Sequence, residues 1–305
     1  MFSGSLVAIV TPMRPDGALD CAAWDRLIEF HLANGSGGIV VGGTTGESAT
    51  LTDAELTELA TRACAQARGR IPVIVGAGSS STAATVERVR RLSELPIDAL
   101  LVVTPAYNRP TQEGLYLHFA AAARSARKPL LLYNVPARTA VDMQPETVVR
   151  LSRVPGIVGL KEAVPDAARL RALVAAVAAD FVLLSGDDAS AREALACGAR
   201  GVISVTANVA PGPMSEMVAA ALAGDQVRAQ LLDARLAALH RALFLEANPI
   251  PVKWAVAQMG LIGTAVRLPL TPLSEAHHAT VRAAACAAGA LPAGAEAGIA
   301  VGMSA

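Results

Sequence analysis

Eight short apolar runs recur along the first two thirds of the chain, and segments with helical periodicity lie between them. The runs are rich in Val, Ile and Leu and start about 20 to 35 residues apart. We expect strands at these eight runs: Ser5–Val10, Gly38–Val41, Pro72–Gly76, Ala99–Val103, Leu130–Tyr133, Ile157–Lys161, Phe181–Ser185 and Gly201–Val205. Strands that are apolar throughout are typical of parallel pairing with both faces covered, so the pattern predicts an α/β fold, a (β/α)8 TIM barrel. A doubly wound open sheet gives a similar alternation, and the strand count alone leaves that alternative open.

Helical signals are clearest at one helix start and beyond residue 224. The stretch TDAE at residues 52–55 has the form of a capping box and predicts a helix that runs towards Ala67. After Gly224 the strand pattern stops, and the long helical pattern AGDQVRAQLLDARLAALHRALF is followed by two shorter ones near Pro251–Met259 and Ser274–Ala288. We therefore expect three parts: a catalytic barrel over 1–224, a small all-helical C-terminal domain over 225–292 and a disordered Ala- and Gly-rich tail over 293–305.

Composition narrows the class of protein. The 305 residues are 53% hydrophobic with a formal net charge of zero and no basic run, so neither nucleic acid nor an anionic membrane is an expected partner. Four scattered cysteines without a CxxC pair indicate reduced thiols, and no apolar stretch reaches transmembrane length. The five histidines are dispersed, so no metal site is expected. These features together predict a soluble, cytoplasmic protein.

Polar residues gather where the expected strands end. In a (β/α)8 barrel the active site forms at the carboxyl ends of the strands, so the residues that follow each run are the candidates. The second run leads into GGTTGES, the fourth into TPAYNRP, the fifth into YNVPART and the seventh into SGDD. Two of only three tyrosines fall at these ends. The candidate site residues are Thr44, Thr45, Tyr107, Tyr133, Arg138 and Lys161.

Lys161 ends an apolar strand in a chain whose 26 Lys and Arg residues include only three lysines, the others being Lys128 and Lys253. A lysine at a strand end often extends its amine to solvent or pairs with a carboxylate. Burial in a barrel mouth instead disfavours the ammonium form, and a neutral amine can attack a carbonyl to form a Schiff base, as a guanidinium cannot. The apolar strand, the scarcity of lysine and the nearby tyrosines favour a nucleophile, with the tyrosines carrying protons.

The remaining candidates suit the binding of a carboxylate, although each has a simpler interpretation. GGTTGES alone would be a glycine-containing turn with a helix cap, but its backbone N–H groups and the hydroxyls of Thr44 and Thr45 also suit an anion. Arg138, which follows Pro136, is either a surface arginine or a bidentate carboxylate clamp. The tyrosines, taken singly, are as consistent with a core or an interface.

Seven motifs occur together in a familiar order and spacing: GTTGES, TPxYNRP, YNVPxRT, GLKEA, LLSGDD, GVISVTANV and NPIPVKWA. Over residues 1 to about 290 the chain thereby resembles the dihydrodipicolinate synthase family of pyruvate-dependent class I aldolases. The resemblance implies that pyruvate condenses with Lys161 as an imine and then an enamine. The enamine would attack L-aspartate 4-semialdehyde and yield 4-hydroxy-tetrahydrodipicolinate, in the diaminopimelate route to lysine. No metal or organic cofactor is implied, and the implied assembly is a homotetramer of two tight dimers.

The resemblance also implies a role for each candidate. Tyr133 would be the central proton donor and acceptor, linked through Thr44 to Tyr107, which a neighbouring subunit would contribute. The implied substrate-binding groups are Thr45 and the backbone of Ile203 for pyruvate and Arg138 for the carboxylate of the semialdehyde.

One departure from the family concerns inhibition by lysine, which in many relatives binds in a crevice at the dimer interface. The matching positions here are Ser80, Ala84 and Ala106, with Asp53 and Leu56 nearby. Ala84 offers the ligand's ammonium no acid or amide, and Ala106 offers it no aromatic ring. We therefore expect a degenerate effector site, in which Asp53 could partly substitute as a partner for the ammonium.

Two alternative functions remain open. An N-acetylneuraminate lyase or a 2-keto-3-deoxy sugar acid aldolase shares the lysine and tyrosine chemistry, but the threonine pair and Arg138 favour a small carboxylated aldehyde over a long polyol. A non-catalytic 2-oxo-acid-binding sensor would keep the pocket. The intact set of proton-carrying residues counts against a sensor, because a protein that only binds needs no proton relay.

Overall fold

The structure, a computed structural model, describes residues 2–292 and contains the closed parallel barrel that the apolar runs predict. The strands are β1 (Gly4–Ala8), β2 (Gly38–Val41), β3 (Val73–Gly76), β4 (Ala99–Val103), β5 (Leu130–Asn134), β6 (Ile157–Glu162), β7 (Val182–Ser185) and β8 (Gly201–Ser204). Each strand pairs in parallel with the next, and β1 pairs with β8. The sheet is therefore closed, and the open-sheet alternative is wrong. The expected tail over 293–305 lies outside the described residues.

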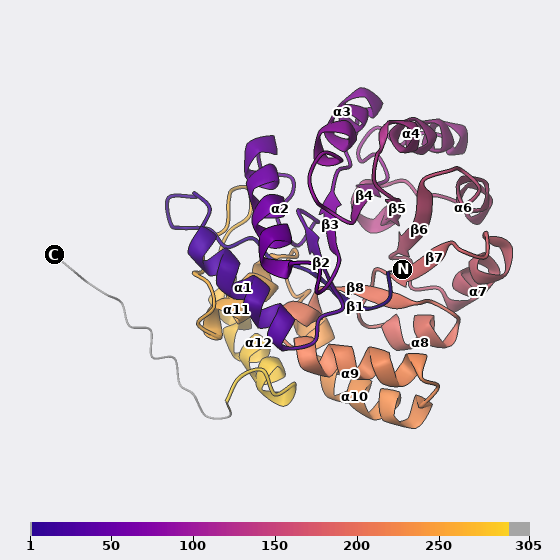
Figure 1. The fold of residues 1–305 in the computed structure, drawn as a ribbon. Coiled ribbons are helices and arrows are strands. Elements are labelled where there is room, and N and C mark those ends of the chain that lie inside the picture. The colour runs from indigo at the N-terminus through magenta and orange to yellow at the C-terminus, as the bar shows by residue number, and fades with distance from the viewer. Residues whose placement is uncertain (1, 293–305) are drawn as a thin grey trace.

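Helices form a ring around the strands, as Figure 1 shows. Those of the ring are α1 (Cys21–Ala33), α2 (Asp53–Ala67), α3 (Thr82–Leu92), α4 (Gln112–Ser125), α6 (Pro145–Leu151), α7 (Ala167–Ala176), α8 (Ala191–Ala196) and α9 (Pro211–Leu222). The capping box at the start of α2 is confirmed: the Thr52 side chain accepts from the Glu55 backbone N–H, and the Glu55 carboxylate accepts from the Thr52 N–H. Two short helical turns, α5 (Pro136–Thr139) and η1 (Thr206–Asn208), follow β5 and β8 directly.

The strands separate two apolar clusters. Leu6, Ile74, Leu131 and their neighbours face into the barrel and fill its interior. Alternate strand residues such as Val7 and Leu132 face outward and pack under the helices. Because both faces are buried, the strands read as continuous apolar runs in the sequence, which is why their positions could be predicted.

Beyond the barrel lie the three expected helices, α10 (Gln226–Ala242), α11 (Ile250–Gln258) and α12 (Glu275–Ala287). In Figure 1, α10 lies on the outer side of α9, and α12 packs against α10 and α11. Buried residues of these helices, such as Leu239 and Val281, belong to the same apolar cluster as the helix layer around the barrel. The boundary at residue 224 stays a prediction, since this cluster continues across it.

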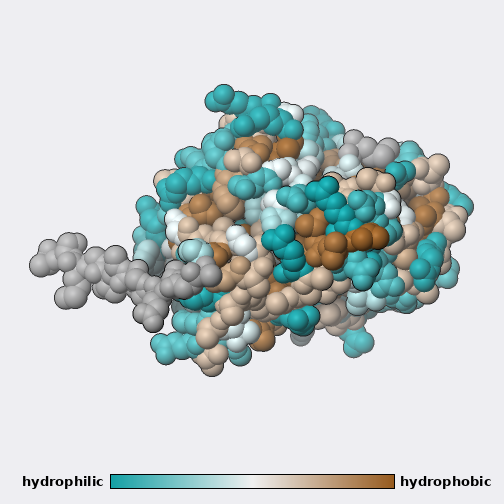
Figure 2. Space-filling view, turned by 90° about the horizontal axis from the view of Figure 1, so that it is seen from below, coloured by the Kyte–Doolittle hydropathy of each residue, from teal (hydrophilic) through white to brown (hydrophobic). Residues whose placement is uncertain are grey.

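The outer surface is mixed in hydropathy. Figure 2 shows a face on which strongly hydrophobic residues form separate patches between hydrophilic ones. No helix within residues 2–292 is both long enough and apolar enough to cross a membrane. Among the described residues, the most exposed large apolar side chains are Tyr107, Leu268, Val227 and Leu231. Tyr107 is the one of these four that the sequence places in the active site.

Candidate active site

Lys161 and Tyr133 lie side by side inside the barrel, near the carboxyl ends of their strands. The two residues pair directly across β5 and β6, and the Lys161 Nζ lies 4.2 Å from the centre of the Tyr133 ring. Both side chains are buried, with exposed fractions of 6% for Lys161 and 7% for Tyr133. The structure thus brings together the predicted nucleophile and the predicted proton carrier.

A β-bulge in β6 determines which way Lys161 points. Leu130 pairs with Ile157, but the next residue, Leu131, pairs with Gly159, so Val158 is an extra residue in β6. Since strand side chains alternate between faces, one extra residue exchanges the inward and outward positions that follow it. A Cβ at Gly159 would lie 2.5 Å from the Val182 carbonyl oxygen, so the bulge requires glycine there.

Gly186 makes room for the Lys161 side chain, and sequence reasoning missed it. A Cβ at this position would lie 3.0 Å from the Lys161 Cε and 2.9 Å from the Ala163 Cβ, closer than van der Waals contact allows. Gly186 also donates its N–H to the Glu162 carbonyl at 2.6 Å, which holds the turn after β7 against β6. The available signal was the glycine of SGDD, which directly follows a predicted strand end.

A pocket of about 490 Å³ opens beside Tyr133, and Lys161 lies behind the tyrosine rather than in the pocket wall. Thr44, Tyr133 and Arg138 contribute to its wall, as the sequence predicts. Arg138 lies on α5 with an exposed side chain, and its guanidinium has no hydrogen-bond or ion-pair partner among residues 2–292. A free guanidinium at the wall of a pocket suits a ligand carboxylate, which it can bind with two parallel hydrogen bonds.

Thr45 and Glu47 turn away from the pocket and fasten the loop after β2 to the C-terminal helices. The Thr45 hydroxyl accepts a hydrogen bond from the Asn248 side chain at 3.0 Å. Glu47 is 3% exposed and pairs with the fully buried Lys253 of α11, while the Arg267 backbone N–H donates to its second oxygen at 3.1 Å. Burial lowers the pKa of Lys253, and Glu47 opposes that shift. Two side chains of the predicted anion-binding motif GGTTGES, those of Thr45 and Glu47, therefore hold the loop in place.

The structure places the two remaining predicted residues, Ile203 and Tyr107, very differently. Ile203 is 1% exposed and belongs to the cluster inside the barrel, together with Tyr133. Tyr107 is 95% exposed, and its φ of 73° is unusual for a bulky side chain. No hydrogen bond joins the Tyr107 side chain to Thr44 within residues 2–292, and the relay through Tyr107 stays a prediction.

Of the positions predicted for a lysine effector, Ser80 and Ala106 border the same pocket, whereas Ala84 is exposed near the start of α3 and does not line it. Ser80 and Ala106 contribute to its wall, and the Ser80 hydroxyl donates to the Ala106 carbonyl at 2.9 Å. Asp53 also lines it, but its carboxylate is paired with Arg88 at 3.0 Å and with Arg91 at 2.9 Å. Both arginines meet the same oxygen, Oδ1, and their positive charges compete with a ligand's ammonium for this carboxylate.

Comparison with known proteins shows the family to which the chain belongs. The sequence model of the Dihydrodipicolinate synthetase family matches residues 1–288. The chain belongs to this family. A relative from Thioalkalivibrio sulfidiphilus, named 4-hydroxy-tetrahydrodipicolinate synthase, is 55% identical over 289 residues, which are 95% of this chain and 98% of the relative.

Solved structures of family members superimpose closely on this one. The chloride-inhibited dihydrodipicolinate synthase from Acinetobacter baumannii, complexed with pyruvate, gives a TM-score of 0.94 at 48% identity, with 95% of this chain and all of that chain covered. The enzyme from Cyanidioschyzon merolae, with lysine bound, gives 0.92 at 38% identity, with 95% and 99% covered. The fold and the family are therefore those that the motifs predict.

Proposed function

We propose that the protein condenses pyruvate with L-aspartate 4-semialdehyde to give 4-hydroxy-tetrahydrodipicolinate. This reaction forms a carbon–carbon bond in the diaminopimelate route to lysine. One observation carries the proposal: a buried lysine amine lies 4.2 Å from a tyrosine ring at the carboxyl end of the barrel. The name of the 55% identical relative and the pyruvate bound in the Acinetobacter baumannii enzyme support the same reaction. The expected place of this reaction is the cytoplasm.

The neutral amine of Lys161 attacks the ketone carbon of pyruvate, and loss of water leaves an imine. Removal of a methyl proton converts the imine into an enamine, whose terminal carbon attacks the aldehyde of the second substrate. The amine of that substrate then attacks the imine carbon, closes the ring and displaces Lys161. Each of these steps requires a proton to be added to or removed from the substrate or the Lys161 amine. Tyr133, which lies beside that amine, is the group that donates and accepts these protons. The reaction as written needs no metal and no organic cofactor.

The second substrate meets the positively charged side of the pocket. Arg138 binds the carboxylate of the semialdehyde, because its guanidinium has no other partner within residues 2–292 and the two oxygens fit its fork. Thr45 and the backbone of Ile203 hold the pyruvate carboxylate and imine. The Asn248 amide donates to the Thr45 hydroxyl and thereby fixes its position, and the Thr45 O–H remains able to donate to the pyruvate carboxylate.

The proton relay from Tyr133 through Thr44 is completed by Tyr107 of a neighbouring subunit. The nearly full exposure of Tyr107 supports this role, because a tyrosine that projects from one subunit is free to enter the site of another. Catalysis then requires at least a dimer, and the proposed assembly is a homotetramer made of two such dimers. The lysine effector site at Ser80, Ala84 and Ala106 is degenerate in this proposal.

Reductive trapping tests the function directly. Incubation with pyruvate and borohydride is expected to modify Lys161, because reduction fixes the imine as a stable secondary amine. Lys128 and Lys253 serve as internal controls; the first is partly exposed and the second is buried against Glu47. Lys161→Arg should abolish both trapping and turnover with aspartate semialdehyde. Trapping without turnover would indicate a sensor, and turnover by the arginine variant would exclude the mechanism.

A further inference from the structure

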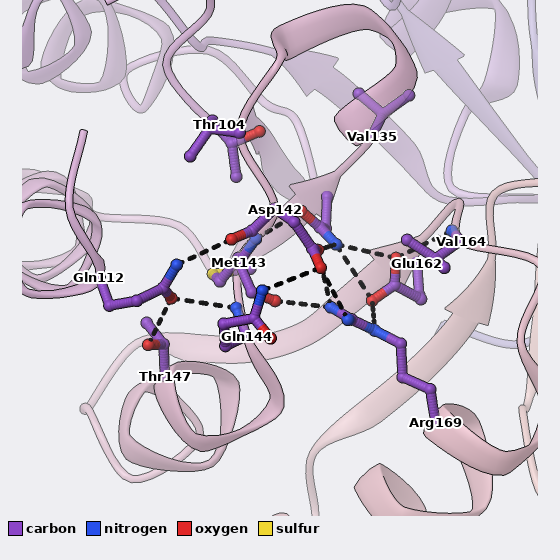
Figure 3. Close-up of polar contacts among 12 residues, drawn as sticks. Thr104, Gln112, Val135, Asp142, Met143, Gln144, Thr147, Glu162, Val164 and Arg169 are labelled. Atoms are coloured by element: carbon purple, nitrogen blue, oxygen red, sulfur yellow. Dashed lines mark hydrogen bonds and ion pairs between the residues drawn. The ribbon is translucent and has the colours of Figure 1, made fainter. Parts of the chain in front are cut away.

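A second polar cluster lies on the other side of the strands from the active site, between the barrel wall and α7. Figure 3 shows it in close-up. We call it the outer clamp, and its members are Asn134, Asp142, Glu162 and Arg169. None of them lies inside the barrel, and none is used by the proposed chemistry. Two members of the outer clamp nevertheless adjoin the catalytic pair in the sequence, because Asn134 follows Tyr133 and Glu162 follows Lys161.

Hydrogen bonds and ion pairs connect all four side chains of the outer clamp. The Asn134 amide donates to Asp142 at 2.8 Å and to Glu162 at 3.0 Å. Arg169 donates to Glu162 at 3.0 Å and to both oxygens of Asp142 at 2.9 Å. The side chains of Glu162 and Arg169 are 3% and 10% exposed. Every charge therefore has a partner, as buried charges require.

The strand geometry couples this cluster to the active site. Asn134 pairs with Glu162 at the rung directly after the one that joins Tyr133 to Lys161. Neighbouring side chains on a strand point to opposite faces. The Lys161 side chain therefore points into the barrel whenever the Glu162 side chain points out of it. Holding Glu162 outside the barrel keeps Lys161 inside.

Apolar burial alone would hold this register poorly. Val158 is an extra residue, and the nearby Ile157 and Leu160 of the same strand are also apolar and buried. A strand that slipped by one residue would still bury aliphatic side chains, but it would turn Lys161 outward. Only the observed register brings Glu162 to Asn134 and Arg169. The polar contacts of the outer clamp can thus specify the register of β6, which the apolar residues of the strand leave undetermined.

We propose that the outer clamp positions Lys161 against Tyr133, so that its members are positioning residues for imine formation. The inference rests on the proposed function, because it concerns the rate of that step. Burial raises the pKa of Glu162, and the Arg169 guanidinium opposes this shift and favours the charged carboxylate. Without Arg169, Glu162 would be left buried without its cationic partner, and only Asn134 would still hold its carboxylate at this end of β5 and β6.

The experiment measures the limiting rate of imine formation at saturating pyruvate, by quenching with borohydride at successive times. Arg169→Met removes the guanidinium, Arg169→Lys keeps a charge, and Glu162→Gln is a milder change of the same volume. We expect Arg169→Met to slow trapping at Lys161 by about ten- to a hundredfold, since small misplacements of a reacting group have effects of this size. Glu162→Gln should slow it less, and Arg169→Lys should recover part of the rate. The half-saturating pyruvate concentration should change little.

A matched control separates positioning from general stability. Arg192 of α8 donates to Asp233 of α10 at 3.1 Å, in another partly buried ion pair outside the active site. Arg192→Met should lower the thermal midpoint without slowing the trapping step. Wild-type trapping rates in both Arg169→Met and Glu162→Gln, with lowered midpoints, would overturn the proposal and leave a purely structural cluster. Absence of trapping in the wild-type protein would overturn the proposed function as well.

Discussion

Lys161 and Lys253 are both buried, yet what faces each amine differs. The Lys253 amine meets the Glu47 carboxylate, which favours its charged form and ties up its protons. The Lys161 amine meets the ring of Tyr133 and has no carboxylate partner among residues 2–292, because the adjacent Glu162 points to the other side of the strand. One lysine therefore fastens a loop, while the other is available to attack a carbonyl.

Gly186→Ala should slow catalysis, because the Lys161 side chain and Ala163 must shift to admit the added methyl group. The added methyl group would press on the Lys161 side chain and on Ala163, while the backbone at this position is one that alanine tolerates. We expect imine formation to slow by about tenfold or more, because the amine must shift from its place beside Tyr133. Borohydride trapping rates and the thermal midpoint are the measurements.

Gly212→Ala in α9 is a suitable control for that variant, since its added methyl group would meet nothing closer than 4.0 Å. It should leave the trapping rate unchanged. Equal trapping rates in the wild type and Gly186→Ala would show that the lysine side chain adapts freely and that Gly186 serves only the turn.

At the scale of elements, the sequence predicted all eight strands to within two residues at each end. It could do so because strands covered on both faces are apolar throughout and are separated by amphipathic helices. The same property hid the bulge in β6. When both faces are apolar, the sequence carries no alternation, so nothing in the run from Ile157 marks Val158 as the extra residue. The chemistry of Lys161 suggested that its side chain points inward, but the apolar pattern carried no information on its direction.

The helix α1 contains a group that should make stability depend on pH. His31 is fully buried, and burial lowers its pKa to about 3, while its Nδ1 lies 3.1 Å from the Ser36 hydroxyl. Between that value and the ordinary pKa of about 6.5, the unfolded chain binds a proton that the folded chain does not, so acid favours unfolding. The stability is complete above pH 7 and is lost as the pH falls through this window. We expect His31 to account for about 2 kcal/mol of lost stability between pH 7 and pH 5.

Urea unfolding at a series of pH values provides the measurement, with His31→Gln as the comparison. Glutamine can still bond to Ser36 but does not titrate, so its curve should be flatter by the same amount. His118, whose pKa burial also lowers, should leave a smaller slope in both proteins. Parallel curves for wild type and variant would show that His31 is not responsible.

At the scale of the whole molecule, the active-site loop depends on residues about 200 positions away. Thr45 bonds to Asn248, and Glu47 bonds to Lys253 and to the backbone of Arg267. Sequence spacing cannot reveal such contacts, because they arise only when the C-terminal helices pack against the closed barrel. For this reason the motif GGTTGES was recognised as functional, while the division of its side chains between pocket and scaffold was not.

Two inactive variants should restore each other's activity if Tyr107 acts across a dimer. A chain with Lys161→Arg keeps Tyr107 but has no nucleophile. A chain with Tyr107→Phe keeps the nucleophile but has no phenol at position 107. In a two-fold dimer that contains one chain of each kind, one site is complete. Random mixing should therefore recover about a quarter of wild-type activity per chain. Coexpression with two different affinity tags isolates the mixed dimer. No recovery would mean that Tyr107 acts within its own chain, and a Tyr107→Phe protein that is active alone would mean that Tyr107 has no catalytic role.

The last prediction concerns the wall of the pocket where an effector would bind. Lysine binding requires an acceptor for its ammonium, and Ala84 provides none, while Asp53 is already shared between Arg88 and Arg91. A charge-assisted hydrogen bond contributes about 1.5 to 3 kcal/mol, and the burial of an aromatic ring, absent at Ala106, contributes about as much again. The loss of both should weaken lysine binding by at least about a hundredfold.

Activity in a coupled assay should consequently stay nearly constant up to about 1 mM L-lysine, a range in which a site with both contacts would be well occupied. The double variant Ala84→Glu and Ala106→Tyr offers the positive control, because it returns an acid and a ring to the two positions that lack them. Its activity should fall as lysine is added, while its trapping by pyruvate at Lys161 remains intact. Half-inhibition of the unmodified protein well below about 1 mM would instead show that Asp53 exchanges its arginine partners for the ligand.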